Sequence, residues 1–402
     1  MNLLRHLPIL LAALLLGAAM PARASIANAP GADLEVSLVS YGPGETYWER
    51  FGHDAIEVRD RVSGQAVNFN YGVFDFNEKN FFVNFARGRM HYLMDADPSA
   101  LDESYYVDSE RSVSRQRLTM NAAQSSALRD FLLWNLRPEN AGYNYDYYVD
   151  NCTTRVRDAL NKALGGVLKT QLSVHAGDMT YRQQTVRLMS AQPWLMLVLD
   201  LGLGPYADQP LNAWQESFLP MELQAQLRKV HISDGNGGQQ PLVRDERLVS
   251  PNHLEVPPAA APDLRLPLAP AGLLLAGLIV LARRRWFPGY ALLGTVYLLT
   301  AGLIGLTLLG LWTLTAHHSA WANANLLLFN PMALLLLPAV WHSRRGYTAS
   351  RLVDGVIVLQ LLAMLIAVLL HLLPGVVQQN QPWLLFAMPC WLAIAWSLRR
   401  HR

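Results

Sequence analysis

Cys152 has the clearest potential for covalent chemistry in this sequence. The chain has two cysteines, and the other, Cys390, falls in a strongly apolar stretch. Asp150 or Asn151 can cap a helix that begins at Cys152. In the first turn of a helix, unpaired backbone N–H groups and the helix dipole stabilise a thiolate, which is the nucleophilic form of cysteine. We therefore predict that Cys152 is a nucleophile, although a free cysteine is commonly just a small buried apolar side chain.

A cysteine nucleophile requires a base, and histidine is the usual one because its pKa lies near neutrality. His53 begins a predicted strand directly after Gly52, a residue that permits close approach of another segment. We predict His53 as the base, with His91 as the alternative. The other histidines of this region lie in loop-like sequence or beside a polar linker, where we expect them to be solvated: His175, His231 and His253.

A third polar group is expected to hold the imidazole ring in one tautomer. The hairpin predicted at 53–72 places residues near Asn70 opposite His53, so Asn70 is our candidate for the third catalytic residue. Asn68 and Asp54 are alternatives, although side-chain alternation directs Asp54 to the opposite face of the strand. A purely structural role for Asn70, in shaping a turn, is also open.

Other kinds of site are disfavoured by the motifs that the sequence lacks. One cysteine and scattered histidines do not have the spacing of a zinc site, so we expect no metal and no cofactor. Gly-x-Ser-x-Gly, the signature of many serine hydrolases, is missing. The Gly-rich stretch at 235–238 precedes no Lys-Ser/Thr pair and no predicted helix. The formal net charge of +2 gives no indication of nucleic-acid binding.

Periodicity predicts an α+β domain around these residues. Apolar and polar residues alternate at 34–41 and 54–58, as in antiparallel strands. Apolar spacing predicts amphipathic helices at 121–136 and 152–164, the second ended by a Gly-Gly pair. We place this domain at 25–232 and a Pro-rich, low-complexity linker at 233–265.

The two ends of the chain predict export and membrane anchoring. Residues 1–24 have the basic start, apolar run and Ala-Arg-Ala stop of a signal peptide. Five apolar segments have close to the 20 or so residues that cross a bilayer; they lie at 266–282, 288–314, 326–342, 352–373 and 383–398. Arginine clusters at 283–285, 344–345 and 399–400 fall on alternate connections, which indicates the cytoplasmic side. The connections at 317–325 and 374–382 contain no lysine or arginine, which places them on the outer side with the exported domain. The tail 399–402 is predicted to be cytoplasmic.

The exported region resembles a known family, the Lnb-type lipoprotein N-acyltransferases, over about residues 34–222. The residues that carry this resemblance are Phe51-Gly52-His53, the run from Asn70 to Phe76, the spacing of Phe85, Gly88 and Tyr92, Asn151 to Arg155 with Asp158, and Trp214 leading to Phe218-Leu219-Pro220. The outer segment 321–325 is also similar. The order of histidine before cysteine is similar to that of circularly permuted papain-like thiol enzymes.

The resemblance implies a permuted papain-like periplasmic domain followed by an all-α membrane domain, anchored in the bacterial inner membrane. It implies that Cys152 and His53 carry an acyl chain from a membrane phospholipid, through a thioester, to the α-amino group of a diacylglyceryl-cysteine lipoprotein. Asn70 has no such support and depends on geometry alone.

Two other functions are open on the same residues. A papain-like cell-wall peptidase or amidase could use the same Cys152–His53 pair, but a single membrane anchor would serve it. A non-enzymatic sensor or scaffold would use Cys152 only for packing.

Overall fold

The computed structural model describes residues 26–74, 78–344, 348–373, 375 and 378–399. The predicted signal peptide at 1–24 and residues 400–402 of the predicted tail lie outside this range. The chain forms two compact units. The sheet unit comprises the chain up to Phe85 together with Arg89–Tyr181 and Pro210–Pro257, and the helical unit comprises Ala86–Gly88, Arg182–Gln209 and Pro258–Arg402.

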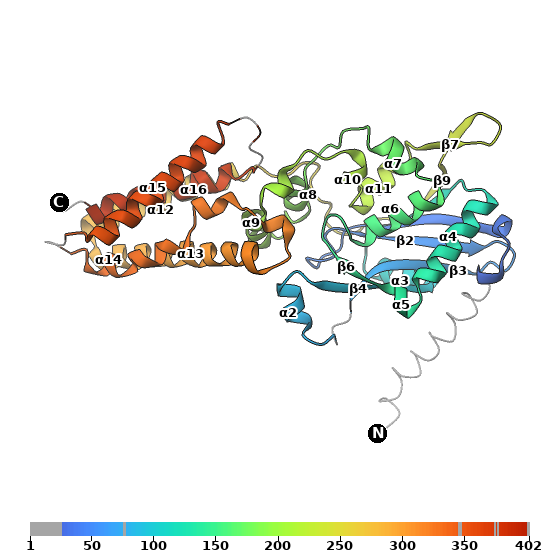
Figure 1. Ribbon diagram of the computed structural model, residues 1–402, viewed down its shortest axis with the longest axis horizontal. Helices are drawn as coiled ribbons and strands as arrows, with labels where there is room; N and C mark the ends of the chain where they lie inside the picture. The colour runs from blue at the N-terminus through green and yellow to red at the C-terminus, as the bar shows by residue number, and fades with distance from the viewer. Residues whose placement is uncertain (1–25, 75–77, 345–347, 374, 376–377, 400–402) are drawn as a thin grey trace, which may run out of the picture. The chain divides into compact units, whose positions relative to one another are not determined.

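The sheet unit is built on a seven-stranded antiparallel sheet with the order β6-β4-β3-β2-β1-β5-β9 (Figure 1). Its strands are β1 (Leu34–Tyr41), β2 (His53–Asp60), β3 (Ala66–Phe74), β4 (Met90–Pro98), β5 (Val113–Leu118), β6 (Gly142–Tyr145) and β9 (Val243–Ser250). A separate two-stranded ribbon pairs β7 (His231–Ser233) with β8 (Gln239–Pro241).

Helices cover both faces of this sheet. α4 (Ala122–Asn135) packs on β1, and α6 (Cys152–Ala163) packs on β2 and β3. α3 (Ser99–Asp108) packs against β3, β4 and β5. Shorter helices complete this part of the chain: η1 (Gly31–Asp33), α2 (Phe81–Ala86), α5 (Pro138–Ala141), α7 (Val167–Leu172), α10 (Ala213–Glu216) and α11 (Pro220–Leu227). The α+β class predicted from periodicity is therefore confirmed.

The main core lies between the sheet and helices α4 and α6. Leu38, Ile56 and Phe69 of the central strands are fully buried there against Leu132 and Leu160. Burying a large apolar side chain contributes about 2 kcal/mol relative to leaving it exposed. This packing fixes the position of α6 on the sheet.

The prediction that the linker begins at residue 233 is wrong for residues 239–250, which form strands β8 and β9. β9 is the edge strand of the main sheet, and most of its side chains are exposed. It is held by backbone pairing with β5 and by ion pairs such as Arg117–Asp245. Charged residues are typical of edge strands because they discourage pairing with other chains. They also remove the apolar alternation from which strands are predicted.

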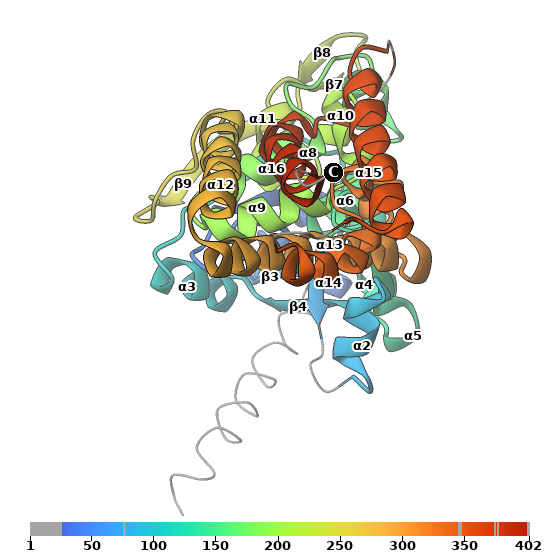
Figure 2. The same cartoon turned by 90° about the vertical axis from the view of Figure 1, so that its left-hand side faces the viewer.

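The helical unit contains five segments long and apolar enough to cross a membrane. They are α12 (Arg265–Arg285), α13 (Phe287–Leu314), the composite segment Ala324–His342, α15 (Arg351–Leu370) and α16 (Gln381–Arg399). α16 packs between α12 and α15 (Figure 2). The five membrane segments expected from the sequence are therefore present, four of them as single long helices.

The arginine clusters gather at one end of this unit. Arg283 donates to the Ser397 carbonyl at the end of α16, and the Arg344 guanidinium lies 5.3 Å from the Phe287 ring centre at the start of α13. At the other end, the two connections without lysine or arginine meet, where Asn380 donates to Asn325 over 2.9 Å. The clusters whose positions predict a cytoplasmic side therefore share one end of the helical unit.

The third membrane segment is not the continuous helix that hydropathy predicts at 326–342. It consists of the 3-10 turns η4 (Ala324–Leu327) and η5 (Pro331–Leu336), followed by α14 (Leu337–His342). Pro331 has no backbone N–H and disfavours helical geometry at Asn330. The buried Asn330 side chain caps the Met332 N–H at 3.1 Å, and Gln360 donates to the Leu327 carbonyl at 3.0 Å. These side chains replace helix hydrogen bonds that a membrane environment cannot supply.

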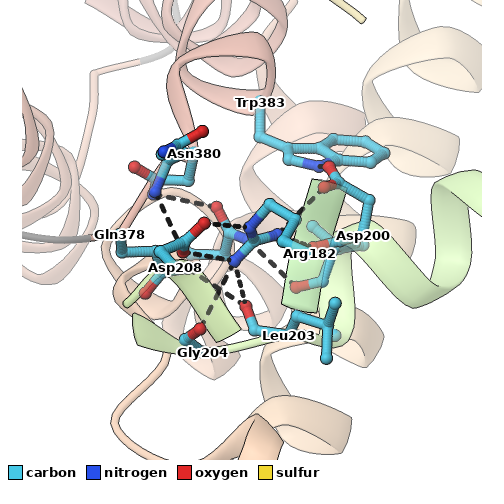
Figure 3. Close-up of polar contacts among 12 residues, drawn as sticks. Arg182, Asp200, Leu203, Gly204, Asp208, Gln378, Asn380 and Trp383 are labelled. Carbon is cyan, nitrogen blue, oxygen red and sulfur yellow. Dashed lines mark hydrogen bonds and ion pairs between the residues drawn. The ribbon is translucent and has the colours of Figure 1, made fainter. Parts of the chain in front are cut away.

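Residues Arg182–Gln209 belong with the membrane helices rather than with the sheet. They contain most of α8 (Tyr181–Leu188), with α9 (Pro193–Gly202) and η2 (Pro205–Asp208). Arg182, only 4% exposed, donates to Asp208 and Asp200 over 2.7 and 2.9 Å. Asp200 in turn accepts from the Trp383 indole of α16 at 2.7 Å (Figure 3). A buried, fully bonded ion cluster thus ties this segment to α16.

We expect Arg182→Ala to destabilise the helical unit by about 3 to 5 kcal/mol, because it leaves two buried carboxylates without their cation. Thermal unfolding of the detergent-solubilised protein measures this effect. Arg265→Ala is the matched control, since Arg265 is an exposed arginine of the same unit paired with Asp263. Equal melting temperatures for the two variants would contradict the prediction.

Candidate active site

Cys152 is the first residue of α6, as predicted from the capping sequence. Asn151 is the cap: its side chain accepts the Thr154 N–H at 2.9 Å, and the Thr154 hydroxyl accepts the Asn151 N–H at 2.8 Å. Asp150, the other possible cap, instead forms an ion pair with Arg155. The thiol therefore lies where free N–H groups and the helix dipole favour negative charge.

The Cys152 thiol lies close enough to the imidazole of His53, the first residue of β2, for each group to shift the pKa of the other. Burial raises the pKa of the thiol, but the facing imidazolium and its hydrogen bond outweigh burial and lower it. Burial likewise lowers the pKa of His53, but the thiolate, followed by hydrogen bonds to Cys152 and Asn70, raises it to about 9. The two opposite pKa shifts favour the thiolate–imidazolium form of the pair over the neutral form.

Asn70 holds the other side of the ring. His53 Nε2 lies 3.0 Å from Asn70 Oδ1. The Asn70 amide nitrogen donates to Asp102 Oδ2 at 3.3 Å, and a carboxylate can only accept, so the amide oxygen is the atom that faces the histidine. His53 Nε2 therefore carries a proton. Nδ1 is the ring nitrogen that remains for interaction with the thiol.

Asp102, at the start of α3, was not predicted from the sequence. It accepts hydrogen bonds from the Tyr41 hydroxyl at 2.7 Å and from Asn68 at 2.8 Å, as well as from Asn70. Its charge also helps to raise the pKa of His53. Asp102 is thus a positioning residue behind Asn70. No sequence signal distinguishes it, because its partners lie on strands that precede it by more than 30 residues.

The ring of His53 is also held by aromatic stacking. It stacks on Tyr41 and Tyr106 with ring centres 5.9 and 6.1 Å away. The two tyrosines stack on each other at 3.6 Å. The imidazole is therefore held by stacking on its ring as well as by the hydrogen bond at Nε2. Neither tyrosine was predicted from the sequence as part of the site.

The competing candidates lie elsewhere. Asn68 shares a face with Asn70 but is bonded to Asp102 and Tyr41. Asp54 is on the opposite face, as predicted from alternation, where it accepts the Ser40 hydroxyl at 2.6 Å. His91 is exposed on β4 and packs beside Gly142. The remaining candidates are exposed as expected: His175, His231 and His253.

We expect Asn70→Ala to slow turnover about 100-fold, the scale of losses caused by a misplaced catalytic group. Asn68→Ala is the matched control, because Asn68 lies two residues away on the same face and also bonds Asp102 but not His53. The control should lose stability and keep most of its turnover. Steady-state kinetics of both variants test this, and equal kcat values would exclude a role for Asn70 in orienting His53.

Comparison with known families identifies both parts of the chain. Residues 22–192 match the model of the Lnb N-terminal periplasmic domain, and residues 267–398 match that of the Lnb transmembrane domain. The chain belongs to the Lnb family. Searches among curated proteins and among solved structures found no significant match.

The Lnb family models assign residues 22–192, which include Cys152 and His53, to the periplasmic domain of a membrane protein. No group of three or more histidine, cysteine or carboxylate side chains that could hold a metal ion occurs in the described part of the chain. The Cys152–His53–Asn70 arrangement is one that can perform nucleophilic attack on a carbonyl carbon with proton transfer by histidine.

Proposed function

We propose that this protein is a lipoprotein N-acyltransferase of the inner membrane that works through an acyl-thioester on Cys152. The observation that carries the proposal is a thiol at a helix start beside a histidine that Asn70 orients. Membership of the Lnb family, with its periplasmic and transmembrane domains, supports the choice of lipid substrates.

In the first step, the Cys152 thiolate attacks an ester carbonyl carbon of a membrane phospholipid. A carbon–sulfur bond forms and the bond between the carbonyl carbon and the glycerol oxygen breaks. The His53 imidazolium gives its proton to the departing oxygen, so that a lysophospholipid leaves. Backbone N–H groups at the start of α6 are available to the oxygen that becomes negative.

In the second step, the α-amino group of a diacylglyceryl-cysteine lipoprotein attacks the thioester carbonyl. A carbon–nitrogen bond forms, the carbon–sulfur bond breaks, and neutral His53 takes the proton that the amine loses. The products are an N-acylated lipoprotein and the thiolate–imidazolium pair with which the cycle began. Five membrane segments suit this reaction, because both substrates are lipids confined to the bilayer.

The proposal is tested by intact mass spectrometry after incubation of the purified protein with phospholipid vesicles. We expect a gain of one fatty-acyl mass that hydroxylamine removes and that Cys152→Ser lacks. An unmodified Cys152 would overturn the thioester mechanism. Release of peptides from cell-wall fragments, without acylation, would support the alternative of an inner-membrane papain-like peptidase or amidase.

A further inference from the structure

The hydroxyl group of Tyr143, on β6, has no hydrogen-bond partner among the described residues, although its side chain is buried and only 6% of the residue is exposed. A buried hydroxyl without a partner is unfavourable by about 1 to 3 kcal/mol. The neighbouring Tyr71 is different, because its hydroxyl donates to Asn135 at 2.9 Å. An unsatisfied buried polar group calls for an explanation, and a catalytic role is one.

The Tyr143 hydroxyl lies beside the nucleophile. Gly72, at a bulge in β3 with φ of +96°, leaves open a position that a Cβ atom would occupy. Cys152 Cβ lies 3.4 Å from this position, and the Tyr143 hydroxyl lies 3.9 Å from it. The thiol-bearing carbon and the free hydroxyl therefore border the same small space.

The hydroxyl is able to donate. Burial, followed by the charge of Cys152, raises the pKa of Tyr143, so the phenol keeps its proton throughout the neutral range. The Arg155 guanidinium lies 4.3 Å from the centre of the Tyr143 ring, and its charge acts to lower the pKa of the phenol, which strengthens the O–H group as a donor. A neutral phenol bearing a cation on its ring is a good donor to a developing negative oxygen.

We propose that the Tyr143 hydroxyl is an oxyanion donor, binding the carbonyl oxygen of the acyl group as it becomes negative during attack by Cys152. This inference depends on the acyl-thioester mechanism proposed above. The hydroxyl has no partner among the residues that the structure describes, and the tetrahedral oxygen would supply one in both steps. Tyr143 makes only a hydrogen bond: no covalent bond to it forms or breaks, and its proton stays on the phenol.

Tyr143→Phe removes only this hydroxyl. We expect the rate of acyl-thioester formation from phospholipid to fall by about 100- to 1,000-fold, as when one oxyanion donor is lost elsewhere. The melting temperature should be unchanged or higher, because an unsatisfied group disappears. Tyr71→Phe is the matched control. It removes the hydroxyl that donates to the side-chain oxygen of Asn135, so it should lower the melting temperature and leave acylation near the wild-type rate.

Alkylation of Cys152 by iodoacetamide distinguishes oxyanion binding by Tyr143 from an effect of Tyr143 on the reactivity of the thiol. Alkylation creates no carbonyl oxyanion, so Tyr143→Phe should react with iodoacetamide at the wild-type rate. Unaltered acylation in Tyr143→Phe would overturn the inference and leave the thioester mechanism standing. Slower alkylation in parallel with slower acylation would also overturn it, since Tyr143 would then act through the thiolate. Absence of acylation in the wild-type protein would overturn both proposals.

Discussion

Cys152→Ala is expected to abolish transfer of an acyl chain to a diacylglyceryl lipopeptide, with a loss of at least about 1,000-fold. The loss is this large because the thiol supplies the bond through which the acyl group passes. Without it, the other residues of the site can only bind the substrates. Mass spectrometry of the lipopeptide product measures the rate directly, and growth of cells that depend on the enzyme gives an independent readout.

Cys390→Ala is the matched control for this variant. Cys390 is fully buried in α16, and its thiol donates to the Gly272 carbonyl of α12 at 3.5 Å. We expect this variant to keep its transfer rate, because its thiol only packs between helices. Equal activity of Cys152→Ala and Cys390→Ala would remove the acyl-transfer proposal and favour a sensor or scaffold in which both cysteines are structural.

The central features of the site could be predicted because each depends on local sequence. A capping residue places Cys152 at a helix start, and Asn151 does so through its capping box. In the β2–β3 hairpin, Asn70 pairs with Ala55, which lies two residues after His53. The hairpin therefore brings Asn70 close to His53. Alternation along β2 then separates His53 from Asp54.

The rest of the site depends on contacts between segments distant in sequence. Asp102 comes from a helix on the opposite side of the sheet from α6, and Tyr143 comes from a four-residue strand beside β4. Neither position has a pattern that separates it from an ordinary polar or aromatic residue. The same limit applies to Arg182, whose sequence neighbours suggest the exported domain although its partners include Asp200 and Asp208 of the helical unit.

His53→Ala is expected to slow both steps of the reaction, each by about 100- to 10,000-fold, the usual contribution of a general acid–base group. In the first step the leaving oxygen would lack a proton donor, and in the second step the amine would lack a base. The variant should also alter how the thiol responds to pH, because His53 is the main group that opposes the effect of burial on Cys152.

The direction of that pH effect follows from the two pKa shifts. In the wild-type protein the pKa of Cys152 is lowered, so the thiolate forms below the pH range of an ordinary thiol, and the imidazolium is lost only as the pH rises through about 9. Acylation, which needs both charged groups, should therefore be fastest between these limits and decline above about pH 9. In His53→Ala the main effect that opposes burial is lost, so the pKa of Cys152 should rise. The pH at which iodoacetamide alkylation becomes fast should therefore be higher than in the wild-type protein. Identical alkylation profiles for the two proteins would show that His53 does not activate Cys152.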